Sequence, residues 1–320
     1  LLIFRAAEGL GETIYFPGSM SMISDYHGKE TRSRAMGIHQ TSVYVGTIAG
    51  GYFAGLLAQE YGWRWSFLVF GGLGILLGFV LHKFLKEPVR GAMEATPAAT
   101  GGSSNKELWR ALRTTPTVWL LMGAFLCANF AAVVLLTWMP KFIHDKFNLN
   151  LAMSGLTATL FVQLASMCGS PLGGWLADKL RSRKPGGRML IQMTGVLLGA
   201  PFIVLCGASQ SVGVLIFALT LWGLFKGLYD ANIWASLFDV IRPEVRGTAV
   251  GLMNMMGWLA GGGSAPIVIG WVATKAGLGT AIGLTSGVYI IAAVLLLVAA
   301  LVTAPRDMLR DSSPAAGAAR

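Results

Sequence analysis

The chain has 320 residues, of which 54% are hydrophobic and only 12% are charged, with a formal net charge of +10 at pH 7. Soluble domains usually carry about 25% charged residues, so this composition excludes an ordinary soluble protein and indicates an integral membrane protein. The sequence lacks the alternating ten-residue pattern of a membrane β-barrel, and its apolar runs are long enough to cross a bilayer as helices.

Hydrophobic runs along the chain predict nine membrane-spanning helices. The expected spans are residues 2–24, 35–58, 65–86, 116–140, 152–178, 189–208, 213–238, 248–274 and 279–303. The last three spans repeat the first three at a constant offset of 214, so that Gly9 aligns with Gly223 and Glu12 with Lys226. The three middle spans have no counterpart. We therefore expect an all-α membrane protein of two six-helix halves, with nine of an expected 12 helices present and the first three missing.

The same repeat predicts the domain boundaries. Residues 1–86 would form the last three helices of an N-terminal six-helix bundle, and residues 116–304 a C-terminal six-helix bundle. Residues 87–115 would be a cytoplasmic linker, because the segment contains a stretch of Gly, Ala, Ser, Thr and Pro that favours flexible chain. Residues 305–320 would be a cytoplasmic tail.

The basic residues are distributed unevenly between the two ends of the predicted spans. The segments 25–34, 83–113, 178–188 and 242–246 and the C-terminal tail lie on one side and hold 19 of the 25 Lys and Arg residues. Cytoplasmic loops of membrane proteins carry such an excess of positive charge, so this side is predicted to be cytoplasmic. The same asymmetry explains the net charge without nucleic acid as a partner.

Four short patterns resemble the major facilitator superfamily. They are GGWLADK at 173–179, Arg32 followed by AMG at 35–37, Arg246 followed by AVG at 249–251, and GWRW at 62–65. The resemblance covers nearly the whole chain and implies a secondary transporter in which two helix bundles rock about a central site. It implies no enzymatic activity and no cofactor. The four scattered histidines also give no metal site.

Within that superfamily, the segment from Arg5 to Glu12 is similar to an Arg, Gly, Glu pattern on the fourth helix of two groups. Phe16-Pro17 fits the anion:cation symporters, which take up organic anions with protons. The segment 87–91 (EPVRG) fits the spinster-like transporters of lipids and lysolipids. The resemblance leaves both groups open. In both, the arginine and the glutamate work with charged residues on the first helix.

Two opposite charges, Glu12 and Lys226, occupy matching positions in the repeat. A charge in the middle of a membrane span costs about 2.5–3.5 kcal/mol on insertion scales, so a polar pathway is the usual reason for it. We interpret Glu12 as the proton-coupling group. Arg5 lies seven residues earlier, nearly on the same helix face, and would hold an anionic group. The alternative is a static ion pair of Arg5 with Glu8 or Glu12.

The second half offers a corresponding set of candidate substrate-binding residues. Lys226 would present its ammonium to an anionic group of the substrate, with Tyr15, Tyr229, Asp230 and Asn129 lining the same cavity. The spacing of four between Lys226 and Asp230 also allows the two to neutralise each other on one helix face. Both interpretations stay open.

Charged residues also recur at the predicted cytoplasmic ends of the spans. The superfamily resemblance implies an inner gate of salt bridges there, and the alternative is ordinary solvated interfacial charge. The candidate gate residues are Asp178, Arg181, Arg32, Arg246, Asp25 and Asp239.

The leading hypothesis is a monomeric, proton-coupled carrier that takes up a small organic anion, such as a sugar acid, across a bacterial inner membrane. Its partners would be the substrate, protons and the lipid bilayer, and its C-terminus would be cytoplasmic. One alternative is a spinster-like exporter of a lipid, lysolipid or other amphiphile, which requires an apolar cavity wall with a lateral opening. Another is a membrane scaffold or sensor that keeps the fold without transport.

Overall fold

Every element that the computed structural model describes is a helix. It describes residues 32–86, 112–241 and 246–308, together with Tyr15, Gly18, Ser19, Met22, Ile23, Tyr26 and Trp109. The side chains of residues 32–38, 40, 41 and 246 are outside this description. Seven of the described helical segments are long and apolar enough to cross a membrane. The chain is therefore an all-α integral membrane protein.

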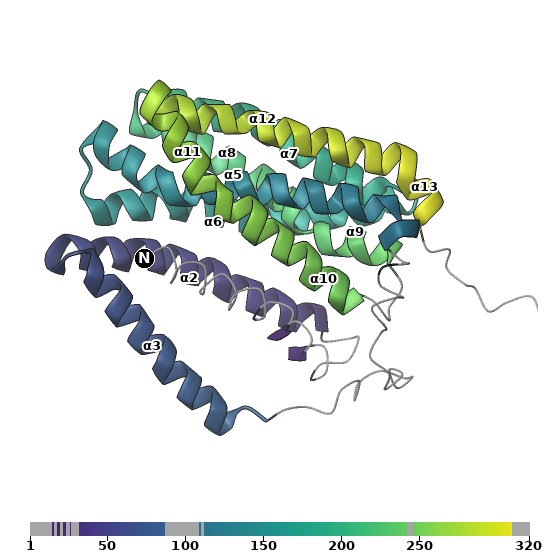
Figure 1. Ribbon diagram of the computed structural model, residues 1–320, viewed down its shortest axis with the longest axis horizontal. Coiled ribbons are helices and arrows are strands. Elements are labelled where there is room, and N and C mark those ends of the chain that lie inside the picture. The colour runs from purple at the N-terminus through teal and green to yellow at the C-terminus, as the bar shows by residue number, and fades with distance from the viewer. Residues whose placement is uncertain are drawn as a thin grey trace, which may run out of the picture.

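The described helices follow one another along the chain. They are α2 (Arg32–Tyr61), α3 (Trp63–Phe84), α5 (Pro116–Phe147), α6 (Leu151–Arg181), α7 (Gly187–Ala208), α8 (Val212–Asp230), α9 (Ile233–Val240), α10 (Arg246–Met255), the π-helix η2 (Met256–Gly262), α11 (Gly263–Ala276), α12 (Leu278–Val298), the π-helix η3 (Ala299–Thr303) and α13 (Ala304–Asp307). The described elements from α5 onward pack into one elongated bundle, while α2 lies along one side of it (Figure 1). A continuous apolar core runs through that bundle.

Glycines set the close contact between α6 and α8. A Cβ atom at Gly173 would lie 2.6 Å from the Cα atom of Leu228, and one at Gly223 would lie 2.8 Å from the Cα atom of Val162. Helices in a membrane gain little from hydrophobic burial, so close backbone approach between small residues is a main source of their association. This contact fixes α8, which carries Lys226 and Asp230, against α6.

The α2–α3 pair makes fewer contacts with the bundle. A Cβ atom at Gly55 would lie 2.7 Å from the Cα atom of Ala152, so the end of α2 and the start of α6 meet backbone to backbone. Gly62 then adopts a φ of 90°, which a glycine accepts readily, and the chain reverses into α3. None of the residues of α3 is buried, and Figure 1 shows the helix diverging from α2.

Among the described residues, the structure departs from the predicted spans at three places. The expected span 35–58 lies within α2, which is helical but is not among the seven segments apolar enough to cross a membrane. The seventh span is broken at residues 231–232, between α8 and α9, and the Nδ2 group of Asn232 donates to the carbonyls of Leu228 and Gly173 there. These bonds satisfy backbone groups that a break would leave exposed. The eighth span contains η2 over a glycine-rich stretch, and such π-helical turns recur at functional sites. Hydrophobic pattern alone reveals neither the break nor the π-helix.

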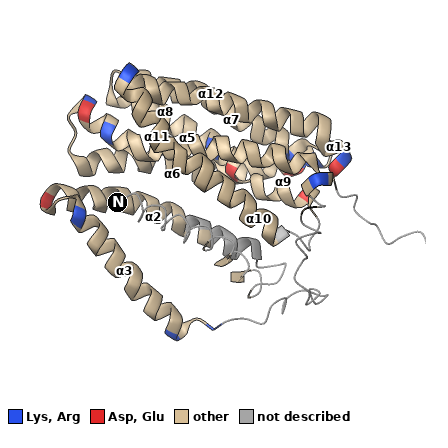
Figure 2. Ribbon diagram, in the orientation of Figure 1, with Lys and Arg blue, Asp and Glu red and all other residues tan. Residues whose placement is uncertain are grey.

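The charged residues gather at the two ends of the described helices, with few between them (Figure 2). The span from Val212 to Val240 is an exception, because it contains Lys226 and Asp230 in the last turns of α8. These two residues form the candidate polar site inside this span.

Candidate functional site

Lys226 and Asp230 form an ion pair on one face of α8. The Nζ atom of Lys226 donates to the Oδ2 atom of Asp230, and the two side chains are 16% and 29% exposed. A spacing of four residues places the side chains one above the other on the helix. Lys226 therefore has a local partner, as the spacing allows. Both side chains keep part of their surface open, so other groups can approach them.

Three buried tyrosines, from three helices, interact electrostatically with this pair. Tyr229 of α8 and Tyr289 of α12 lie within electrostatic range of Asp230, and both are buried. Tyr44 of α2, also buried, lies within electrostatic range of Lys226. Tyr44 and Lys226 are far apart in the sequence. The sequence analysis places Tyr229 at the site but omits Tyr289.

Some buried polar atoms on α6, α8 and α10 have no hydrogen-bond partner among the described residues. They include the hydroxyl of Tyr229, the Oε1 atom of Gln163 on α6 and the Nδ2 atom of Asn254 on α10. Buried polar groups are nearly always bonded to protein or to water. Tyr229, Gln163 and Asn254 therefore offer donors and acceptors that a water molecule or a polar ligand would satisfy.

Asn129 lies on α5, beside the π-helical turn of η2. Its Nδ2 atom donates to the carbonyl of Phe125 at 2.9 Å. A Cβ atom at Gly257 would lie 3.0 Å from the same Nδ2 atom, so α5 and η2 touch here. The structure thus places Asn129 against a π-helix, which is a context that supports a binding role. Its part in binding stays a prediction.

A second set of charges joins the ends of α6, α7 and α9. Arg181 bonds Asp239 at 3.0 Å, and Arg188 bonds both Asp239 at 3.2 Å and Asp178 at 2.8 Å. Asp239 is only 9% exposed, whereas Asp178 is 70% exposed. Two arginines therefore hold one buried carboxylate, and the exposed carboxylate adds a peripheral bond. We refer to these four residues as the helix-end network.

Arg188 is the member of that network that the sequence analysis misses. It is the second residue of α7, where the positive end of the helix dipole disfavours a cation. A basic residue at that position is the signal that predicts a nearby carboxylate partner. One turn later, Gln192 donates to Ser236 of α9 at 2.5 Å, so the same face of α7 is bonded to α9 twice.

Several predicted site residues lie outside the described part of the chain. Arg5, Glu12 and Asp25 are among them, and so are the side chains of Arg32 and Arg246. Their roles stay predictions.

Tyr15 is described, and its side chain is exposed. Its hydroxyl lies 3.1 Å from the Nε2 atom of His39 on α2. The two rings stack with their centroids 6.0 Å apart. His39 is thus a neighbour of Tyr15, and the part of Tyr15 in the cavity stays a prediction.

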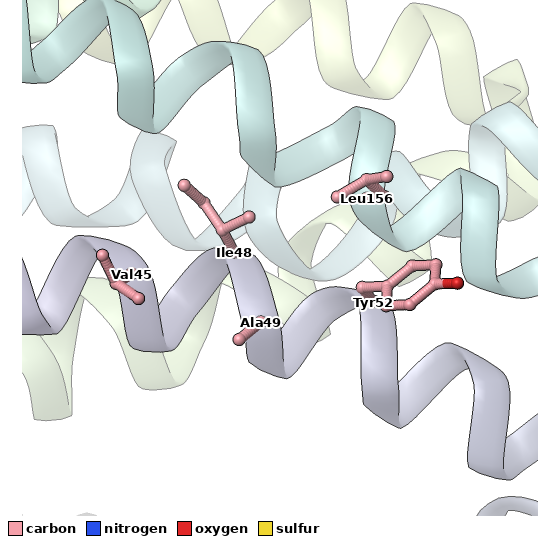
Figure 3. Close-up of a pocket in the computed structure, with 5 residues that line it drawn as sticks. All are labelled: Val45, Ile48, Ala49, Tyr52 and Leu156. Carbon is pink, nitrogen blue, oxygen red and sulfur yellow. The ribbon is translucent and has the colours of Figure 1, made fainter.

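An apolar groove of about 250 Å³ lies between α2 and α6. Figure 3 shows its walls, formed by Val45, Ile48, Ala49 and Tyr52 of α2 and by Leu156 of α6. The groove offers no polar surface for an anion. Among the described residues, no group of three or more His, Cys, Asp and Glu is placed to hold a metal ion.

Two curated proteins illustrate what the chain is similar to. It is 30% identical over 273 residues to the "Probable anion transporter 1, chloroplastic" of Oryza sativa subsp. japonica, a match over 82% of this chain and 51% of that protein. It is 29% identical over 288 residues to "Protein spinster" of Drosophila melanogaster, over 84% of this chain and 46% of that protein. The chain thus spans about half the length of these relatives.

A solved structure shares the fold. A bacterial homologue of the human lysosomal transporter spinster, in an inward-facing and unoccupied conformation, matches 92% of this chain and 76% of its own, with a TM-score of 0.72 at 19% identity. The family model described as Major Facilitator Superfamily matches residues 1–265. These findings confirm the resemblance and the fold class predicted from the sequence. The chain belongs to the Major Facilitator Superfamily.

Proposed function

We propose that the protein is a proton-coupled carrier that takes up a small organic anion, such as a sugar acid. The observation that carries this proposal is Lys226, an ammonium inside a membrane span whose recorded ion-pair partner is the single carboxylate of Asp230. An anionic substrate group competes for that ammonium. The buried hydroxyl of Tyr229, one turn along α8 from Lys226, then offers a hydrogen bond to the polar remainder of the substrate.

The transport cycle in this proposal alternates access between the two sides of the membrane. Residues 1–86 and 116–304 act as parts of two bundles that rock about the central site, with residues 87–115 as their linker and residues 305–320 as a tail. Glu12 binds and releases the driving proton, and Arg5 and Lys226 hold the anion from opposite walls. Tyr229, Asn129 and Tyr15 line the path.

The helix-end network belongs to the inner gate in this proposal. Asp178, Arg181 and Asp239 form its part in the second bundle together with Arg188, and Asp25, Arg32 and Arg246 contribute the remaining charges. The positive-inside distribution of Lys and Arg supports a cytoplasmic position for this end and for the C-terminus. The membrane would be a bacterial inner membrane, and the carrier would work as a monomer.

The test is uptake by the complete protein in liposomes under an imposed inward proton gradient. Radiolabelled D-glucarate, ascorbate and inorganic phosphate serve as probes, with protein-free liposomes as the control. We expect D-glucarate or ascorbate to accumulate, and to cease accumulating when a protonophore removes the gradient. Accumulation of phosphate alone contradicts an organic-anion substrate. The Glu12→Gln variant should bind that anion but lose gradient-driven uptake. Uptake of none of the three anions contradicts the proposal.

The groove between α2 and α6 favours a second candidate, which is export of a lipid or lysolipid. Its wall of Val45, Ile48, Ala49 and Leu156 suits an acyl chain and has no group for an anion. A fluorescent lysophospholipid distinguishes the two candidates in the same liposomes. If its export depends on the protein and the three anions do not move, the amphiphile is the substrate. A bulky Ala49→Phe substitution should then block export.

A further inference from the structure

The turn between α6 and α7 carries basic residues that the helix-end network does not use. Segment 179–188 contains five Lys and Arg residues, and the network includes two of them. The other three are Lys179, Arg183 and Lys184, and all three are exposed. Among the described residues, the structure records no ion pair for any of these three. Three such cations on one short turn attract an anionic partner from outside the chain.

Hydrogen bonds and a close backbone contact hold this turn in one shape. The backbone amides of Arg183 and Lys184 both donate to the carbonyl of Leu180, at 3.1 Å and 2.9 Å. Gly186 packs against η3, because a Cβ atom at Gly186 would lie 2.7 Å from the Cα atom of Ala300. A turn that is already ordered loses little conformational freedom when it binds a ligand.

One face of α6 leads from the middle of the span to this turn. On it lie Leu164, Leu172 and Trp175, which are 48%, 44% and 59% exposed. Lys179 continues the same face, with its Nζ atom 5.1 Å from the centroid of the Trp175 ring. Exposed apolar side chains of a membrane span face lipid acyl chains, while Trp and Lys at its end reach the headgroups. The face therefore suits one lipid molecule, with its acyl chains along α6 and its headgroup at the turn.

A face of α11 has the same arrangement without the extra cations. Ile267 and Trp271 are 69% and 61% exposed, and the Nζ atom of Lys275 lies 4.0 Å from the centroid of the Trp271 ring. The segment 276–305 that follows contains no Lys or Arg. The two faces thus share an apolar residue, a tryptophan and a lysine. Arg183 and Lys184 distinguish the face on α6.

We propose that the α6–α7 turn binds the headgroup of an anionic phospholipid, such as phosphatidylglycerol. Lys179, Arg183 and Lys184 bind the phosphate and its negative charge, and the acyl chains lie against Leu172 and the residues before it on α6. Each Lys or Arg near an anionic membrane surface strengthens such binding by roughly fivefold. The proposal is independent of the transported substrate.

Photocrosslinking in vesicles tests the proposal, with the α11 face as the matched control. The photoreactive amino acid p-benzoylphenylalanine replaces Leu172 in one variant of the complete protein and Ile267 in another. Both variants are placed in vesicles of equal parts phosphatidylglycerol and phosphatidylcholine, and mass spectrometry identifies the lipid attached after illumination. We expect the ratio of phosphatidylglycerol to phosphatidylcholine to be at least about fivefold higher at residue 172 than at residue 267.

Further changes assign that ratio to the three cations. Replacing Lys179, Arg183 and Lys184 together by Gln should lower the ratio at residue 172 to that at residue 267, and high salt should act in the same direction. Should the triple variant not fold, Lys184→Gln alone should still lower the ratio severalfold. Equal ratios at residues 172 and 267, or a ratio at residue 172 that the substitutions leave unchanged, would overturn the proposal. Free glycerol 3-phosphate should not compete, because it lacks acyl chains, and competition by it would indicate a site for soluble phosphate instead of lipid.

Discussion

Two ion pairs in this chain have the same local geometry and different surroundings. Lys141–Asp145 on α5 and Lys226–Asp230 on α8 both join a lysine to an aspartate four residues later. The side chains of the first pair are 59% and 50% exposed, and those of the second pair are 16% and 29% exposed. We call them the outer pair and the inner pair. The spacing of four residues produces both pairs. Only in the less exposed inner pair does loss of one partner leave the other charge poorly solvated.

The difference follows from the dielectric environment. An exposed i,i+4 pair contributes about 0.3–0.5 kcal/mol, because water solvates either charge after the pair opens. A partly buried pair leaves a poorly solvated charge when it opens, so another charged group in place of the lost partner is favoured. The inner pair is therefore suited to exchange one partner for an anionic ligand. The outer pair is ordinary helix-surface charge.

The largest expected effect is on transport through the inner pair. Lys226→Gln should lower the apparent affinity for the transported anion at least about tenfold, because a hydrogen bond to a charged group contributes about 1.5–3 kcal/mol. Initial uptake rates over a range of anion concentrations measure this change. Lys141→Gln removes the lysine of the outer pair and should leave the rates unchanged. Equal effects of the two variants would remove the distinction between the pairs.

The helix-end network allows the same comparison of a less exposed with a more exposed charge, now by its effect on the free energy of unfolding. Asp239 is 9% exposed and bonds both Arg181 and Arg188, so Asp239→Asn should lower the free energy of unfolding by about 3 kcal/mol or more. Asp178 also bonds Arg188 but is 70% exposed. Its change to Asn should cost about 1 kcal/mol or less. Unfolding followed by intrinsic fluorescence in detergent compares the two, and similar losses would mean that burial does not govern this network.

The next largest effect concerns the packing of α6 against α8, which holds the inner pair in place. Gly173→Ala forces a methyl group to within 2.6 Å of the Cα atom of Leu228 and should cost about 1–3 kcal/mol. Its neighbour Gly174 has no atom within 4 Å of an added Cβ, so Gly174→Ala should be neutral or slightly stabilising. Thermal unfolding in detergent measures both variants. A stable Gly173→Ala protein would show that α6 and α8 separate at little cost.

The smallest effect concerns the outer pair itself. Asp145→Asn should change the free energy of unfolding by about 0.5 kcal/mol or less. Added salt should weaken even that contribution, because the Debye length falls to about 3 Å at 1 M ionic strength. Denaturant unfolding at low and high salt provides the measurement. A loss well above 1 kcal/mol would indicate an undetected partner for the outer pair.

The parts of this protein that follow from local rules were predictable from the sequence. The helical spans follow from apolar runs of membrane length, and the bond between Lys226 and Asp230 follows from their spacing. Other features depend on where distant segments meet. Arg188 gains its carboxylates only because α7 and α9 pack together, and the break after Asp230 is stabilised by Asn232 through the carbonyl of Gly173 on α6.

The apolar groove shows the same limit. Its walls come from α2 and α6, and their contact depends on Gly55 and Ala152, which are about a hundred residues apart in sequence. A hydrophobic pattern predicts each helix. It does not predict which two helices pack together so that a groove remains between them. The role of Glu12, by contrast, rests on the repeat and the superfamily resemblance, and it stays a prediction that the transport assay addresses.

The most direct test of the central claim is the chemical reactivity of two lysines in one protein. An amine-acylating reagent is applied to the complete protein with and without D-glucarate or ascorbate, and mass spectrometry measures acylation of Lys226 and Lys141. The account predicts that the anion protects Lys226 and leaves Lys141 equally reactive, because only the inner pair exchanges its partner. Equal acylation of Lys226 with and without a transported anion would contradict the account.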